Sequence, residues 1–192
     1  MEGAALSNQS ESAPSTRGSR APTEQVLDAL SLGRGLAVLR VFVGLIAFSN
    51  GLAKLFSFRA IEIGPYASSL IDRSEAREIL ALEIGRNDLP LLPTLVNDVI
   101  LPAYETFGWL LTFTELGVGA LLILGLMSRG AALVAFALHF FLQLVYFSSG
   151  RFAFEQPHEW VPPLILAFVA SGMVWGLDSR LDRNRDGARW PC

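Results

Sequence analysis

Residues 35–58 read GLAVLRVFVGLIAFSNGLAKLFSF, a stretch that is long and apolar enough to cross a bilayer. About 20 apolar residues in a helix cover a hydrocarbon core of ~30 Å. A 4-3-4-3 spacing places small and charged residues on one face of this helix: Arg40, Gly44, Ala47, Gly51 and Lys54. Small residues permit close approach of two backbones, and charged residues avoid lipid. We therefore expect this face to pack against other helices and to form one wall of a polar seam.

The composition of the whole chain is typical of a membrane protein. Of its 192 residues 52% are hydrophobic and only 17% are charged, and the mean hydropathy is +0.42. The net charge of −3 and the lack of a basic stripe argue against a nucleic-acid partner. The single cysteine, Cys192, excludes an internal disulfide and a cysteine-rich zinc site.

We predict an all-α integral membrane four-helix bundle, with spans at about 35–58, 103–127, 131–147 and 160–177. Residues 1–34 are predicted to be a disordered cytoplasmic tail with a short surface turn at 26–32, and residues 179–192 a polar cytoplasmic tail. Residues 59–102 form an outer loop of about 40 residues, long enough to cap one mouth of the bundle. Within it, Ser74 is the expected N-cap of a surface helix over 75–86. More arginines flank the spans on the side of the termini, which predicts an inner (cytoplasmic) membrane protein with both termini cytoplasmic.

The second and third spans carry polar residues that can meet the first. A 3-4-3-4 spacing aligns Glu105, Gly108, Thr112, Glu115 and Gly119 on one face, and His139 and Gln143 are i, i+4 neighbours. A carboxylate near the middle of a membrane costs several kcal/mol unless it is paired or protonated. We predict that Lys54 neutralises Glu105 at the outer rim and that Arg40 reaches toward Glu115.

Two interpretations of this seam remain open. Its members can bind a polar ligand or exchange a proton, in which case the candidates are Arg40, Glu115, His139, Gln143 and Asn50. They can equally hydrogen-bond one another and fix the packing of the helices. His139 has no second ligand at metal-binding spacing, so no metal site is predicted. No phosphate-binding glycine loop or hydrolase motif is present.

Several segments resemble the DoxX family of membrane proteins. They are an arginine early in the first span, then GLAKL at 51–55, ELGVGALLILGLMSR at 115–129 and SGMVWGLD at 171–178. The resemblance covers residues 35–180 and implies a four-helix bundle. It also implies a membrane subunit of a quinone-linked redox complex, similar to the subunit of thiosulfate:quinone oxidoreductase and not active alone.

By this resemblance the seam positions a quinone that is not covalently attached. Since these 192 residues include no soluble thiosulfate-handling domain, we expect that part to come from another protein. The alternative is a non-catalytic assembly subunit that docks onto a larger membrane complex. In both cases the expected partners are the lipid bilayer and proteins that bind the outer loop, 59–102.

Overall fold

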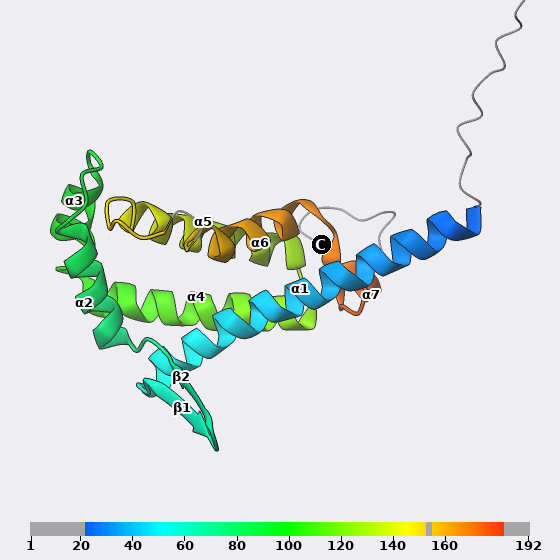
Figure 1. Ribbon diagram of the computed structural model, residues 1–192, viewed down its shortest axis with the longest axis horizontal. Helices are drawn as coiled ribbons and strands as arrows, with labels where there is room; N and C mark the ends of the chain where they lie inside the picture. The colour runs from blue at the N-terminus through cyan, green and yellow to red at the C-terminus, as the bar shows by residue number, and fades with distance from the viewer. Residues whose placement is uncertain (1–21, 153–154, 183–192) are drawn as a thin grey trace, which may run out of the picture.

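The computed structural model describes residues 22–152 and 155–182 and is mostly helical (Figure 1). Its three long helices are α1 (Pro22–Phe56), α4 (Tyr104–Leu124) and α5 (Ser128–Val145). All three are long and apolar enough to cross a membrane. Large apolar side chains such as Leu45, Phe113 and Val134 are exposed on them, as lipid-facing positions are. The chain is a membrane protein, and the predicted helical class is confirmed.

The first helix is longer than the predicted span. α1 begins at Pro22, so the surface turn expected at 26–32 is continuous with the membrane helix. Isolated glycines at 33 and 35 do not interrupt it, since a single glycine lowers helix propensity without ending a helix. The predicted disordered tail falls largely on residues 1–21, which lie outside the described residues. Most of the predicted C-terminal tail does so as well, at 183–192.

Small residues bring α1 and α4 into close contact. A Cβ on Gly119 would lie 2.5 Å from the backbone nitrogen of Phe48, and one on Gly51 would lie 2.8 Å from that of Leu116. Gly44 faces the backbone of Ile123 in the same way. The face of small residues predicted from the spacing in the sequence is therefore the face that packs against a neighbouring helix.

The other helix pairs complete the packing. α5 contacts α4 on one side and α6 (Pro157–Phe168) on the other, and α6 also contacts α1. A cluster of small and branched side chains fills the space between them: Val43, Ala47, Val118, Leu122, Ala131, Ala132, Ala135, Leu166 and Ala167. Figure 1 shows α5 and α6 side by side on one side of the molecule, with α4 and α1 on the other.

The helix α6 is shorter than the fourth span predicted at 160–177. α6 has 12 residues and stops at Val169, whose backbone is extended. A 3-10 turn (η2, Ser171–Met173) and the short α7 (Asp178–Asp182) follow. The helix ends early because the carbonyl groups of Ser171, Val174 and Trp175 accept hydrogen bonds from Arg40 of α1 instead of the backbone hydrogen bonds that would extend the helix.

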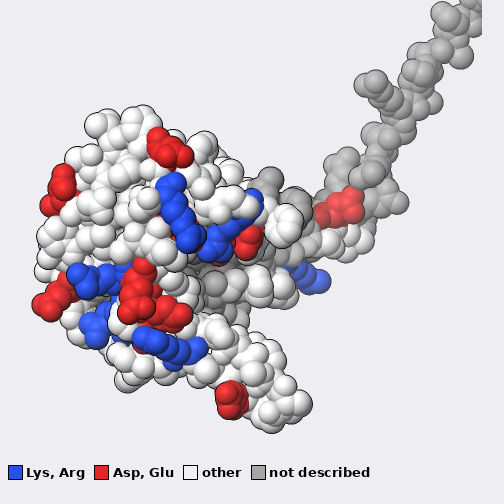
Figure 2. All heavy atoms as spheres, turned by 60° about the vertical axis from the view of Figure 1, so that its left-hand side comes forward, with Lys and Arg blue, Asp and Glu red and all other residues white. Residues whose placement is uncertain are grey.

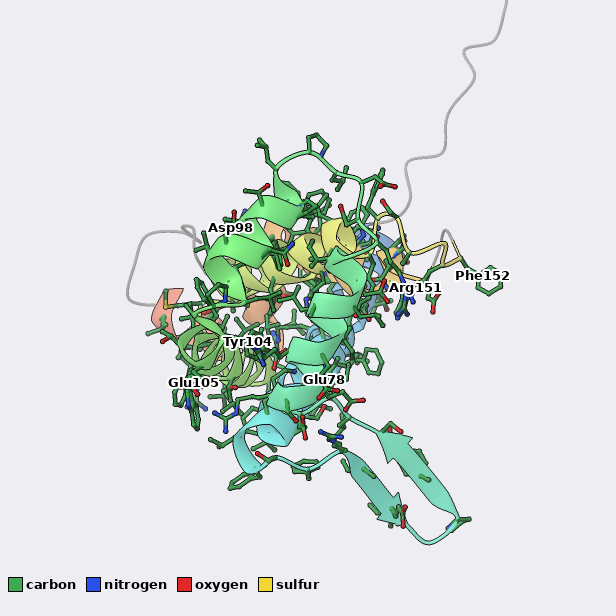
Figure 3. The ribbon with its side chains drawn as sticks, turned by 90° about the vertical axis from the view of Figure 1, so that its left-hand side faces the viewer. Glu78, Asp98, Tyr104, Glu105, Arg151 and Phe152 are labelled. Carbon is green, nitrogen blue, oxygen red and sulfur yellow. The ribbon has the colours of Figure 1, made fainter. Side chains whose placement is uncertain are left out.

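Residues 59–102 are folded. They form a β-hairpin (β1, Ala60–Ile63; β2, Tyr66–Ser69), then α2 (Arg73–Ile84), α3 (Leu92–Leu95) and a π-helical turn (η1, Val96–Ile100). The N-cap of α2 is Asp72, which accepts a hydrogen bond from the Glu75 backbone N–H. The prediction of Ser74 as the cap was wrong, because the Ser74 hydroxyl instead donates to Asp72. α2 packs across α4 and α5 at one end of the molecule, as Figure 3 shows.

Candidate functional site

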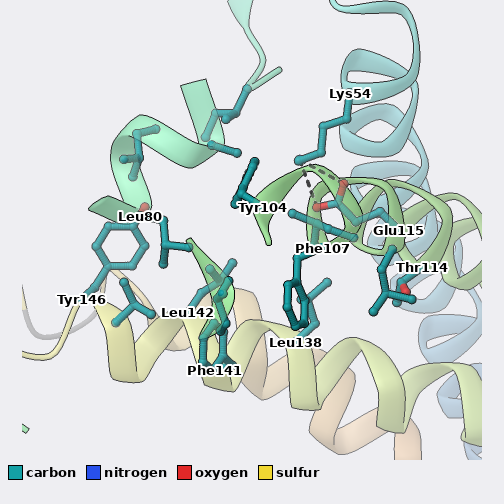
Figure 4. Close-up of a pocket in the computed structure, with 17 residues that line it drawn as sticks. Lys54, Leu80, Tyr104, Phe107, Thr114, Glu115, Leu138, Phe141, Leu142 and Tyr146 are labelled. Carbon is teal, nitrogen blue, oxygen red and sulfur yellow. Dashed lines mark hydrogen bonds and ion pairs between the residues drawn. The ribbon is translucent and has the colours of Figure 1, made fainter. Parts of the chain in front are cut away.

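A cavity of about 280 Å³ lies beneath α2. The cavity exists because α1 packs only against the second half of α4. Gly51 of α1 lies against Leu116 in the middle of α4, and α1 ends five residues later, at Phe56. The first half of α4 continues beyond α1, and α2 crosses over the space that is left. Most of the lining is apolar, and it comes from α2, α4 and α5: Ile79, Leu80, Phe107, Leu111, Leu138, Phe141 and Leu142 (Figure 4).

One end of the cavity carries a buried ion pair. The Lys54 Nζ lies 3.0 Å from Oε1 and 2.9 Å from Oε2 of Glu115. The two residues are 5% and 8% exposed, which is rare for charged side chains unless they are paired. In Figure 4 the pair lies at one end of the cavity, with Phe141 and Tyr146 toward the other.

One polar atom at the cavity has no partner in the described part of the chain. The hydroxyl of Tyr104 lines the cavity, is buried and has no hydrogen-bond partner among the described residues. Glu115 Oε2 makes no contact of hydrogen-bond geometry with these residues either, but it lies 2.9 Å from Lys54 Nζ and is held in the ion pair. Buried polar atoms are usually hydrogen-bonded, so the unpartnered Tyr104 hydroxyl indicates a place for a polar group of a ligand.

The predicted pairing of Lys54 with Glu105 is wrong. Lys54 contacts Glu115, whereas Glu105 is exposed in the first turn of α4. The physical reason is the helix register: the prediction placed the ends of the first two spans level, but α1 ends beside the middle of α4. Glu105 precedes Glu115 by ten residues, or about 15 Å of helix rise, out of reach of Lys54.

Arg40 does not reach toward Glu115 either. Its guanidinium is fully buried and donates to four carbonyl oxygens, those of Leu122 at the end of α4 and of Ser171, Val174 and Trp175 after α6. These carbonyls are at the opposite end of α4 from the cavity. Arg40 therefore fixes the packing of the segment that follows α6, and the interpretation of the seam as structural applies to it.

The remaining candidates are also outside the cavity lining. His139 Nδ1 lies 2.8 Å from the Ala135 carbonyl oxygen of its own helix, and Gln143 Oε1 accepts a hydrogen bond from Trp160 of α6. Asn50 is half-buried on α1. Of the five predicted ligand or proton-exchanging residues, the structure places Glu115 at the cavity. That these residues bind a ligand stays a prediction.

Several lining residues were not predicted. Tyr104 and Tyr146 fall near the ends of the predicted spans at 103–127 and 131–147, and Leu80 falls in the predicted surface helix over 75–86. The sequence places these residues at the end of a span or in an amphipathic helix, and neither position indicates that α2 packs across the ends of α4 and α5.

Fold and site define a helical membrane protein with an apolar cavity that is closed at one end by a buried lysine–glutamate pair. Comparisons with protein-family models, with curated proteins and with solved structures give no match.

Proposed function

We propose that this protein is a DoxX-like membrane subunit of a quinone-linked redox complex and that a quinone ring binds in the cavity beneath α2. The observation that carries the proposal is the buried Tyr104 hydroxyl, which has no hydrogen-bond partner among the described residues and lines the same mostly apolar cavity as the Lys54–Glu115 pair. The motifs at 51–55, 115–129 and 171–178 support the family assignment through their resemblance to DoxX proteins.

A quinone matches these groups in chemical type. Its ring is apolar and its two carbonyl oxygens are acceptors, which the Tyr104 hydroxyl and the Lys54 ammonium can satisfy. The hydroquinone form carries hydroxyl donors instead, and Glu115 Oε2 is an acceptor for one of them. The volume of about 280 Å³ is near the lower limit for ligand sites, which suits a ring but not a long isoprenoid tail. The electrons for reduction come from a partner protein in this proposal.

The test is equilibrium binding of a short-chain quinone to the purified protein in nanodiscs. Tyr104→Phe removes only a hydroxyl, so we expect the affinity to fall about five-fold, the value of one ordinary hydrogen bond. Tyr66→Phe is the matched control, because Tyr66 is 60% exposed on the hairpin. Glu115→Gln should weaken binding of the hydroquinone more than that of the quinone. Absence of saturable binding, or equal binding by the Tyr104 and Tyr66 variants, would refute the ligand assignment.

One observation favours the alternative role as an assembly subunit. The β1–β2 hairpin projects from the body of the molecule (Figures 1 and 3), and its tip exposes Ile63 and Tyr66 by 70% and 60%. A lone two-stranded hairpin is marginally stable in water, so a partner that covers it would stabilise it. Replacing residues 60–69 with a glycine–serine linker should abolish co-purification of that partner and leave quinone binding intact. Unchanged co-purification would exclude the hairpin as the docking element.

We further propose four membrane crossings with both termini in the cytoplasm. Support comes from α6, which runs antiparallel to α5. The start of α6 lies beside the end of α5, where Trp160 donates a hydrogen bond to Gln143. The end of α6 lies beside the start of α5, where Arg129 donates to the Ala167 carbonyl. Labelling of Cys192, the single cysteine, with an impermeant maleimide should require permeabilised cells. A Glu62→Cys variant in a Cys192→Ser background should label in intact spheroplasts, and the reverse pattern would overturn the orientation.

A further inference from the structure

A second, more open depression shares Tyr104 with the cavity beneath α2. It has a volume of about 500 Å³ and is bounded by the end of α1, the first turns of α2 and the first turns of α4. We call it the arginine groove and define it by the residues that line it: Ser57, Asp72, Arg73, Ser74, Arg77, Tyr104, Glu105, Gly108 and Trp109. Figure 2, which brings this end of the molecule forward, shows basic and acidic side chains gathered there.

Within the part of the chain that the structure describes, the two arginines of the groove make no ion pair. Arg73 stacks on the ring of Trp109 at 3.7 Å, and its buried Nε has no hydrogen-bond partner among the described residues. Arg77 follows one turn later on α2, is exposed, and makes no ion pair within the described part of the chain. A guanidinium that stacks on an indole keeps the donors at its edge available for a planar acceptor.

One of the two carboxylates that line the groove, Asp72, is already engaged. Asp72 accepts hydrogen bonds from Arg59 at 2.6 Å, from the Ser74 hydroxyl and from the Glu75 backbone N–H. With Asp72 and Arg59 counted as a neutral pair, the groove has two positive side chains and one negative, Glu105. One monovalent anion would complete the charge balance.

The position of the groove indicates the source of that anion. Trp109 is in the second turn of α4, near the end of a helix that is apolar enough to span the membrane, and tryptophan is typical of the membrane interface. Trp109 stacks on Phe113, and both side chains are exposed on the surface of α4, by 40% and 59%. An apolar surface therefore begins at the groove and continues along α4 toward the middle of the membrane.

We propose that the arginine groove binds the phosphate group of an anionic phospholipid, with an acyl chain of that lipid lying against Trp109 and Phe113. Arginine is suited to this group because its planar fork donates two parallel hydrogen bonds to phosphate oxygens. A basic pocket at the interface is also the known form of lipid-headgroup sites. The arginines that carry this proposal are separate from the proposed quinone site, since neither lines the cavity beneath α2, although Tyr104 lines both.

The experiment is titration of the detergent-purified full-length protein with phosphatidylglycerol, phosphatidylcholine or inorganic phosphate, followed by native mass spectrometry. Phosphatidylglycerol should bind at least ten-fold tighter than phosphatidylcholine. Inorganic phosphate at millimolar concentration should not displace it, because phosphate lacks the acyl chain. Equal binding of the two lipids, or displacement by phosphate, would overturn the lipid assignment.

Variants test the groove itself. Arg77→Gln should weaken phosphatidylglycerol binding about five-fold, the usual contribution of one basic residue at an anionic surface, and should leave quinone binding unchanged. Arg86→Gln is the matched control, because Arg86 is exposed just beyond the end of α2 and outside the groove. Glu105→Gln should have the opposite effect and tighten binding, which keeps the test valid if an arginine variant folds poorly. Identical affinities for the Arg77 and Arg86 variants, or weaker binding by the Glu105 variant, would refute the site.

Discussion

Lys54 of α1 and Glu115 of α4 form an ion pair inside the membrane-spanning part of the protein, with Nζ 2.9 Å from Oε2. Both side chains are almost completely buried, at 6% and 10% exposed, so each is the principal compensation for the charge of the other. The pair also joins the end of α1 to the middle of α4. The same two residues thus set the helix register and close the cavity.

Removal of one charge should be far more harmful than removal of both. Lys54→Met leaves a buried carboxylate without a cation, and we expect it to lower the free energy of unfolding by about 3–5 kcal/mol. The double variant Lys54→Met, Glu115→Leu leaves no buried charge and should recover most of that loss. Unfolding in detergent micelles, followed by circular dichroism, measures both. Losses that simply add would show that the two side chains do not interact.

Gly119 and Gly117 provide a matched pair on α4. A Cβ at position 119 would lie 2.5–2.7 Å from Phe48 of α1, whereas nothing lies within 4 Å of one at position 117. Gly119→Ala should therefore separate the two helices and destabilise the protein by about 1–3 kcal/mol. Gly117→Ala should be neutral or slightly stabilising, because alanine is the better helix former. Thermal unfolding of both variants in the same detergent gives the comparison, and equal melting temperatures would contradict the packing of α1 on α4.

The sequence predicts the helix faces but not the register between helices. Spacing alone identified the face with Arg40, Gly44, Ala47, Gly51 and Lys54, because periodicity is a local property. The partner of Lys54 depends on where α1 ends relative to α4, and that offset is a property of the two packed helices, seen in contacts such as Gly51 against Leu116. The apolar content of a span gives no information on this offset.

The same limit explains the shortened last helix. Residues 160–177 are apolar enough to suggest a span, but Arg40 lies 131 residues before Ser171, whose carbonyl it binds. Arginine buried in a membrane protein requires acceptors, and here backbone carbonyls supply them at the expense of helix hydrogen bonds. No pattern within 160–177 reveals that demand. The hairpin was missed for a simpler reason: its two strands have only four residues each and are largely exposed, which is too short for a periodic pattern to indicate a strand.

The start of α2 should depend on pH through Asp72. The hydrogen bond from Arg59, with those from the Glu75 backbone N–H and the Ser74 hydroxyl, lowers the pKa of the Asp72 carboxyl well below its ordinary value. A carboxyl whose pKa is lower in the folded state stabilises that state above its unfolded pKa of about 4. The contribution is lost as the pH falls from about 4 through the folded-state pKa.

Hydrogen exchange of the first turn of α2 measures this effect. Exchange at Glu75 and Ala76 should speed up, relative to intrinsic rates, as the pH is lowered below about 4. Asp72→Asn should show the faster exchange already at pH 7 and no further acid dependence. An acid dependence that persists in the Asn variant would assign it to another group, and Glu78→Gln, on the same helix but outside the cap, controls for general loss of charge.

Asp178 holds the chain after α6 against the start of α5. Its carboxylate is fully buried and accepts from the backbone N–H groups of Met127 and Ser128 at 2.6 and 3.0 Å, and from the Ser128 hydroxyl at 2.7 Å. It thus caps α5 from 50 residues away along the sequence, and a negative charge at a helix N-terminus is favourable.

Asp178→Ala should leave these donors buried and unpaired, and we expect a loss of about 2–3 kcal/mol in the free energy of unfolding. Ser179→Ala is the control, because the Ser179 hydroxyl bonds only the nearby Gly176 carbonyl, and it should change stability by less than about 0.5 kcal/mol. Since Arg40 binds the carbonyls of Ser171, Val174 and Trp175, the Asp178 variant should also expose that segment to proteolysis. Limited proteolysis in detergent measures this exposure. If the Asp178 variant is cleaved no faster than the Ser179 variant, Asp178 does not hold the segment and the Arg40 hydrogen bonds are sufficient.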